Sequence, residues 1–60
     1  MTEAADFLAT VARAQMRSGA GDWAEAAELW AEVTAANPVN GDYWARLAEA
    51  RLSRLADGTS

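Results

Sequence analysis

The sequence contains no cysteine and no histidine, and its only proline is Pro38. Without cysteine there are no disulfides and no thiol chemistry, and without histidine the commonest general base and metal ligand is missing. Lysine is absent too, so the chain has no glycine-rich phosphate-binding loop of the kind that ends in a lysine. No group of residues has the spacing of metal ligands either. The sequence therefore predicts a protein that is not an enzyme, with no catalytic residues, no cofactor and no metal.

Basic residues are few. Five arginines stand against nine aspartates and glutamates, which gives a formal net charge of −4. Nucleic acids and anionic membranes both need a basic surface, so we expect neither as a partner. The segment 1–6 is acidic where a signal peptide would be basic, and no apolar run approaches the roughly 20 residues of a membrane span. We expect a cytoplasmic protein.

The stretch from Gly21 to Pro38 predicts one complete helix over about 22–36. Asp22 is the expected N-cap, and Glu25 lies three positions later, where it would complete a capping box. Pro38 ends the helix because a proline has no backbone N–H to donate and disfavours helical geometry at the residue before it. Along this segment the apolar residues recur at helical spacing on one face: Trp23, Ala26, Ala27, Trp30 and Val33.

The flanking segments predict two further helices, over about 3–17 and 42–56. Thr2 is the expected N-cap of the first, and the Ser18–Gly21 segment has the composition of a loop. Asn40 or Asp42 is the expected cap of the third. The apolar stripe of the first helix is Phe7, Leu8, Val11, Ala12 and Met16, and that of the third is Tyr43, Trp44, Leu47, Ala48, Leu52 and Leu55.

The first and third helices match one another. The pairs Phe7/Tyr43, Leu8/Trp44, Val11/Leu47, Ala12/Ala48, Ala14/Ala50 and Met16/Leu52 keep their size class at a constant offset of 36 residues. An offset in the range of about 20 to 50 residues, with a helix between the copies, is typical of a helical-repeat protein. The order of elements is therefore a helical hairpin followed by the first half of a second one.

This pattern resembles the tetratricopeptide repeat (TPR) family, over about one and a half repeats. The resemblance is carried by Gly21, Ala26, Trp30, Pro38, Trp44, Leu47 and Ala48, and it covers the first helix more loosely. The chain departs from the family at Gln15 and Arg51, where a tyrosine is usual, and at Val33, where a small residue is usual. The resemblance implies an all-α fold with a single domain over 1–60: a helix–turn–helix unit plus an additional first-type helix, as in a fragment of an α-solenoid.

The aromatic and acidic residues each fit two interpretations, a binding or catalytic site and an ordinary structural role. The tryptophans would suit an aromatic ligand box, but Trp30 and Trp44 fall at family core positions, which favours packing. Glu25, Glu28 and Glu32 form an acidic ridge that would suit a cation or acid–base work, but a solvated face is the stronger interpretation. The predicted core is Leu8, Val11, Ala26, Trp30, Val33, Trp44 and Leu47.

The repeat is unfinished, which points to association. Repeat units bury their apolar faces against neighbours, and about three repeats are normally needed for stability. No second-type helix follows the third helix to cover its stripe, so we expect a self-association interface formed by Trp44, Leu47, Leu52 and Leu55. A pair of chains would form a closed two-fold contact. The alternative is a compact monomeric bundle in which the third helix folds back.

A second hypothesis is a peptide-binding module. In TPR proteins the concave face is lined by first-helix residues off the core stripe, which implies a partner-binding face at Arg13, Arg17, Arg46 and Glu49. Arginine forks suit a carboxylate, although the same side chains would also serve to solvate the helices or to pair with Glu49 and Asp6. Ala9 and Arg13 replace the residues of the family's two-carboxylate clamp, so we do not expect that specificity. A third hypothesis is an excised end of a longer TPR array.

Overall fold

The computed structural model describes residues 3–58, which form three helices: α1 (Glu3–Gly19), α2 (Trp23–Ala36) and α3 (Gly41–Gly58). No strand occurs within this range, so the predicted all-α fold is confirmed. The observed helix ends differ from the predicted ones by at most two residues. The predicted cap Thr2 lies outside the described residues.

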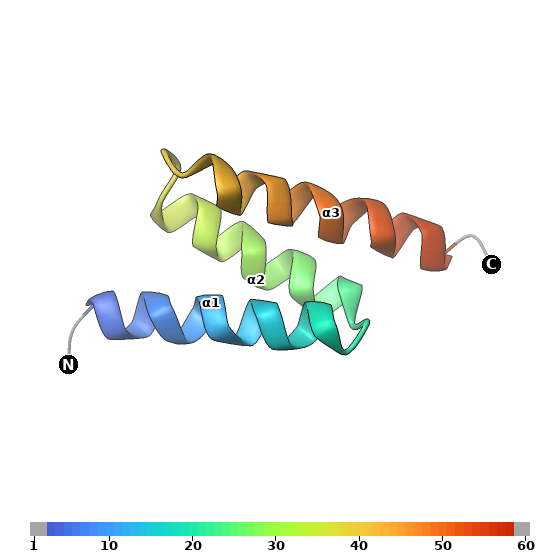
Figure 1. Ribbon diagram of the computed structural model, residues 1–60, viewed down its shortest axis with the longest axis horizontal. Coiled ribbons are helices and arrows are strands. Elements are labelled where there is room, and N and C mark those ends of the chain that lie inside the picture. Colours follow the sequence, from blue (N-terminus) through green and yellow to red (C-terminus); the bar gives the residue numbers. More distant parts are fainter. Residues whose placement is uncertain (1–2, 59–60) are drawn as a thin grey trace.

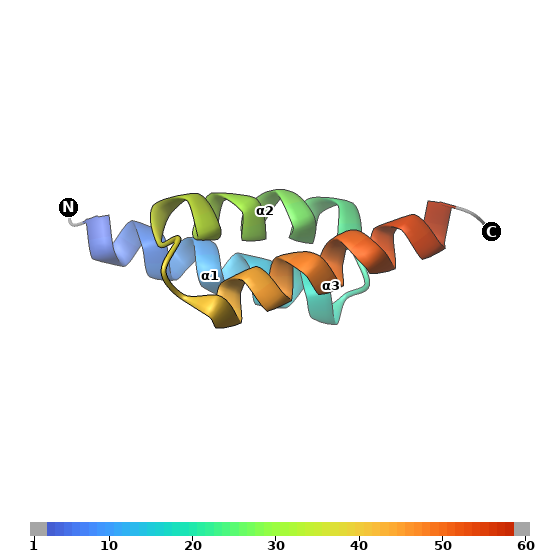
Figure 2. The ribbon, with the colours of Figure 1, turned by 90° about the horizontal axis from the view of Figure 1, so that it is seen from above.

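Helix α2 is the central element, because α1 and α3 both pack against it (Figure 1). The chain reverses direction at each turn, so that α1 and α3 run the same way and α2 runs against both (Figure 1). Seen from above, α2 lies on one side of the molecule, and α1 and α3 lie on the other (Figure 2). The Cα trace spans 42 × 21 × 13 Å, an elongated and thin shape.

The turn between α1 and α2 is a Schellman motif built on Gly21. The N–H of Asp22 donates to the carbonyl of Arg17 at 2.9 Å, and the N–H of Gly21 donates to Ser18 at 3.1 Å. These are the two bonds of the motif, and they require a left-handed residue, which Gly21 supplies with φ of 79°. The helix therefore continues through Ser18 and Gly19, which the sequence had indicated as loop.

The predicted capping box at the start of α2 is wrong. The side chain of Asp22 makes no capping hydrogen bond. Its carboxylate lies 3.8 Å from the guanidinium of Arg17 instead, while its backbone carbonyl accepts the first helical bond from Ala26 at 2.9 Å. At the start of α3 the cap is Asn40, whose Oδ1 accepts the backbone N–H of Asp42 at 3.0 Å.

The core is formed by nine apolar residues and Thr34, all at most 9% exposed. The apolar members are Val11, Ala14, Ala26, Ala27, Leu29, Trp30, Val33, Leu47 and Ala50. Ala14, Ala27, Leu29 and Ala50 were absent from the predicted core. The three alanines among them leave room for close approach between helices, and such small side chains carry a weak periodicity signal.

Aromatic rings join the three helices. The Tyr43 ring of α3 stacks on Trp30 of α2, with centroids 6.2 Å apart, and meets the Phe7 ring of α1 edge-on at 5.7 Å. Trp30 is 2% exposed, and its indole N–H donates to the Ser18 hydroxyl at 3.0 Å, so the buried polar atom of this ring is satisfied. Trp30 therefore fixes α1 and α3 on α2 at once.

Leu8 and Trp44 were predicted in the core, and the structure corrects both. Leu8 is 63% exposed and Trp44 is 46% exposed. The preceding residues, Phe7 and Tyr43, pack against the core instead. Adjacent residues of a helix point about 100° apart, so turning Phe7 and Tyr43 inward turns their neighbours outward. Equivalent positions of α1 and α3 thus have the same orientation. Each helix also exposes apolar side chains on its surface: Leu8 and Met16 in α1, and Trp44, Leu52 and Leu55 in α3.

Gly21 and Gly19 form a matched pair for testing the first turn. Gly21→Ala is expected to lower the free energy of unfolding by about 1 kcal/mol, since alanine is strained at positive φ. Gly19→Ala is expected to raise it by about 0.5–1 kcal/mol, since Gly19 is helical. A new Cβ meets no atom within 4 Å at either position, so only the backbone terms differ. Urea unfolding of both variants measures them, and equal shifts would contradict the assigned turn.

The orientation of α1 is tested by truncating two neighbouring apolar residues. Val11→Ala is expected to cost about 2 kcal/mol of unfolding free energy, because it removes two buried methyl groups and leaves a void. Leu8→Ala removes an exposed side chain and is expected to cost less than about 0.5 kcal/mol. Both residues stand in the same helix, and thermal and urea unfolding compare them directly. The reverse order of the two costs would show that α1 is rotated from its described position.

Candidate association surface

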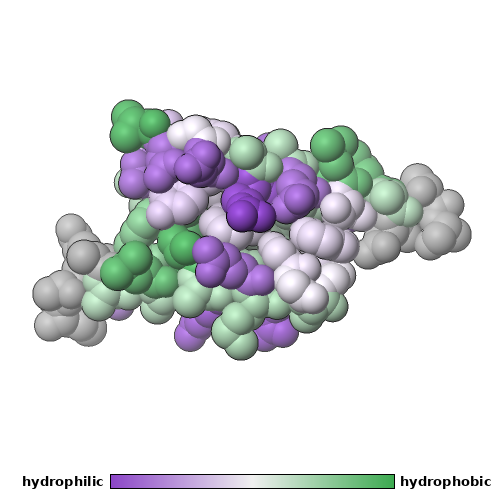
Figure 3. All heavy atoms as spheres, viewed as in Figure 1, coloured by the Kyte–Doolittle hydropathy of each residue, from purple (hydrophilic) through white to green (hydrophobic). Residues whose placement is uncertain are grey.

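The outward side of α3 carries three large exposed apolar side chains, whereas α1 carries two, Leu8 and Met16. Leu52 is 67% exposed and Leu55 is 66% exposed, and with Trp44 they lie along one side of the helix. The space-filling view shows hydrophobic side chains over the second half of α3 (Figure 3). The predicted interface also contained Leu47, but Leu47 is 3% exposed and belongs to the core. We therefore remove Leu47 from the candidate surface.

Trp44 is held in place although it is half exposed. Its indole N–H donates to the carbonyl of Pro38 at 2.8 Å, across the turn between α2 and α3. A large ring fixed by a hydrogen bond loses little conformational freedom when a second surface covers it, which suits an apolar contact.

The last turns of α3 form a projecting segment, which we call the α3 arm (residues 51–56). No residue of the arm is buried, in contrast to Leu47 and Ala50 just before it. Helix α3 has 18 residues and α2 has 14, and the end of α3 extends past α2 in both views (Figures 1 and 2). Among the side chains that the structure describes, those of residues 5–56, no ion pair engages Arg51 or Arg54, so the arm presents leucines together with guanidinium groups that none of these side chains neutralises.

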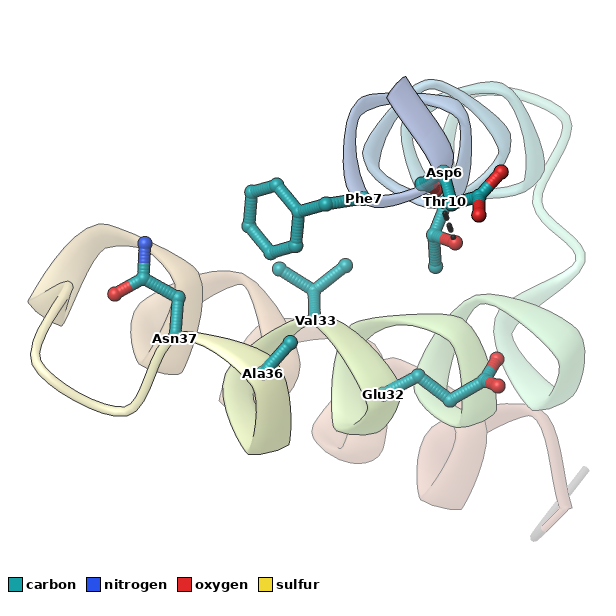
Figure 4. A pocket seen from close by; sticks show the side chains of 7 residues that line it. All are labelled: Asp6, Phe7, Thr10, Glu32, Val33, Ala36 and Asn37. Atoms are coloured by element: carbon teal, nitrogen blue, oxygen red, sulfur yellow. Dashed lines mark hydrogen bonds between the residues drawn. The ribbon is translucent and has the colours of Figure 1, made fainter. Parts of the chain in front are cut away.

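A cleft opens between the first half of α1 and the second half of α2, at the end of the molecule away from the arm. We call it the acidic cleft. Its volume is about 590 Å³, and it is lined by Asp6, Phe7, Thr10, Glu32, Val33, Ala36 and Asn37. In the close-up the side chains of Phe7 and Val33 point toward one another, and the carboxylates of Asp6 and Glu32 lie on the same side of them (Figure 4).

The hydroxyl of Thr10 is engaged within α1, where it donates to the backbone carbonyl of Asp6 at 3.0 Å (Figure 4). The carboxylates of Asp6 and Glu32 take part in no ion pair within the described residues, and both residues are exposed. The cleft therefore combines an apolar floor with two available negative charges. Such a site suits a segment that carries both leucine-like and cationic side chains.

Sequence reasoning missed the acidic cleft as a unit. The sequence indicated Asp6 as an ion-pair partner for an arginine and Glu32 as part of a solvated acidic ridge. The available signal was topological: a hairpin of antiparallel helices brings the start of α1 beside the end of α2, so residues 26 positions apart meet at one end. The acidic ridge itself is exposed at Glu25, Glu28 and Glu32.

A second cleft, of about 540 Å³, lies between the end of α1 and the start of α2. It is lined by Arg13, Met16, Arg17, Ala20, Glu25 and Leu29. Two of the four residues predicted for a partner-binding face, Arg13 and Arg17, are brought together here. The other two, Arg46 and Glu49, line neither cleft and instead pair with each other on α3 at 3.8 Å.

The ion pairs on these surfaces are weak. The side chains of Arg17 and Asp22 are 55% and 46% exposed, and those of Arg46 and Glu49 are 62% and 56% exposed. Exposed pairs at such distances are screened by water and contribute little to stability. Arg17 and Arg46 therefore remain available for other contacts, but they do not form one continuous basic face.

Other kinds of site find no support in the described part of the chain. Among the side chains that the structure describes, no three or more acidic, histidine or cysteine groups are arranged to hold a metal ion. Over the same residues, no helix combines the length and the apolar character needed to cross a lipid bilayer.

Comparison of the chain with protein-family models, with curated proteins and with solved structures finds no match. The resemblance to TPR proteins thus stays a prediction from the sequence. Two surfaces of the molecule bear on its function: an apolar side of α3 that ends in a cationic arm, and an acidic cleft at the opposite end.

Proposed function

We propose that the protein is a small association module that pairs with a second copy of itself through the outward side of α3. The observation that carries the proposal is the row formed by Trp44, Leu52 and Leu55, three large apolar side chains that are each 46% exposed or more. Apolar surface of this kind, gathered on one element and rimmed by charge, is typical of protein–protein contacts.

Burial of this row on association would stabilise the pair by an amount that is large relative to the stability of so small a protein. Full burial of a leucine side chain stabilises by roughly 1.5–3 kcal/mol relative to exposure, and half of the Trp44 surface is already covered. A chain of 60 residues buries too little apolar surface alone to be more than marginally stable. Pairing thus covers the exposed row and supplements the core in one step.

The fold permits this role without rearrangement. Helix α3 turns Tyr43, Leu47 and Ala50 toward the core and its outward row away from it, so a partner can cover the row while the core remains packed. Trp44 is already fixed by Pro38, and so the contact needs little ordering of its largest side chain.

Sedimentation equilibrium over a wide concentration range tests the proposal. The apparent mass is expected to rise from the 6.4 kDa of one chain toward twice that value as concentration increases. Helicity and melting temperature are expected to rise with it. A mass of one chain at every concentration, with melting independent of concentration, would exclude self-association.

Leu52→Glu is expected to raise the dissociation constant of the pair at least tenfold, because a charge would be buried in an apolar contact. Val39→Glu is the matched control, since Val39 is also exposed but lies in the turn outside α3. The control is expected to leave the dissociation constant within about threefold of the wild-type value, a difference of less than 1 kcal/mol. Equal weakening by both variants would show that added negative charge, and not the α3 row, governs association.

A further inference from the structure

The α3 arm and the acidic cleft are opposite in charge and alike in apolar content. The arm carries Arg51 and Arg54 beside Leu52 and Leu55, all exposed. The cleft carries two carboxylates, from Asp6 and Glu32, beside an apolar floor. Neither set of charges is paired within the described residues. Complementary charge around matching apolar surface is what fixes the register of a docked helix.

We propose that the α3 arm of one copy docks in the acidic cleft of a second copy, so that Arg51 and Arg54 meet Asp6 and Glu32. This inference rests on the proposed self-association and specifies what the end of the row that carries Leu52 and Leu55 binds. The leucines of the arm cover the accessible apolar surface of Phe7 and Ala36, and the arginines reach the carboxylates at its edge.

The contact forms between chains and not within one. In Figure 1 the arm lies at one end of the long axis, and the helix segments that line the acidic cleft lie at the other end. The molecule is 42 Å long, which is beyond the reach of the arm in its own chain. Two copies side by side and antiparallel bring each arm next to the partner's cleft. The result is a closed pair with two equal contacts, as a two-fold interface requires.

The second cleft is excluded by its charge. Its charged lining consists of Arg13, Arg17 and Glu25, so positive charge is in excess and opposes the arginines of the arm. Both clefts lie between α1 and α2 and have similar volumes, so charge is the feature that distinguishes them. The arm is thus directed to one end of the groove by attraction there and by repulsion at the other end.

Charge reversal on each side tests the contact. The first variant reverses the cleft, with Asp6→Arg and Glu32→Arg, and the second reverses the arm, with Arg51→Glu and Arg54→Glu. Each variant alone then opposes like charges, and its dissociation constant is expected to rise at least tenfold. An equimolar mixture restores opposite charges at both contacts: the basic cleft receives the acidic arm, and the acidic cleft receives the basic arm. Sedimentation equilibrium of the mixture is expected to show a pair containing one chain of each variant.

The control variant is Glu25→Arg with Glu28→Arg, which makes the same change in net charge outside the acidic cleft. It is expected to self-associate as the wild type does. Circular dichroism of each variant reports whether the helices form, and the mixture provides a second check, since only folded chains can complement one another. Association of the wild type and the mixture is also expected to weaken as salt concentration rises.

The outcomes separate the two proposals. A monomeric wild type would exclude the self-association proposed above and the arm contact with it. A wild type that pairs, with reversed variants that also pair as tightly, would leave self-association standing and overturn the arm–cleft contact. Weakened variants that fail to complement one another would overturn it as well. Only weakening of each variant alone, together with recovery in the mixture, supports the contact.

Discussion

The contact of Tyr43 with Trp30 and Phe7 is the interaction on which the rest of the structure depends. It is the point where one side chain of α3 reaches both other helices. Trp30 supplies the buried centre of this cluster, and its N–H bond to Ser18 ties the end of α1 to the same ring. The orientation of α1 and α3 around their own axes follows from these rings, and with it the choice of which apolar residues face outward.

The number, type and ends of the helices were predictable from the sequence because local signals determine them. Pro38 and the glycine-rich first turn mark the breaks, and the apolar spacing marks the helical segments between them. The hydrogen bonds at the helix ends were harder to predict from the sequence. Asp22 has the right identity and position for a side-chain cap, yet Arg17 lies close enough to attract its carboxylate. That competition depends on the turn geometry, which the glycine conformation sets.

The rotation of the outer helices could not be read from periodicity. Phe7 and Leu8 are both large and apolar, and so are Tyr43 and Trp44, so a stripe centred on either member of each pair fits the pattern equally well. Alanines determine which side of each outer helix faces α2, because Ala14 and Ala50 allow α2 to approach closely on the side that holds Phe7 and Tyr43. The candidate surface was predictable to the same extent. Leu52 and Leu55 were identified correctly as exposed, whereas Leu47 was not, and the acidic cleft needed the pairing of α1 with α2.

The architecture consists of two helical hairpins that share α2, since each outer helix packs on α2 far more than on the other. Such an arrangement folds from local contacts, which favours rapid formation. Either outer helix can undock while the other keeps its hairpin with α2, whereas α2 can be released only when both hairpins are lost. Among the described residues we therefore expect the backbone amides of α2 to exchange most slowly, and those of α1 and α3 to open through separate partial unfoldings.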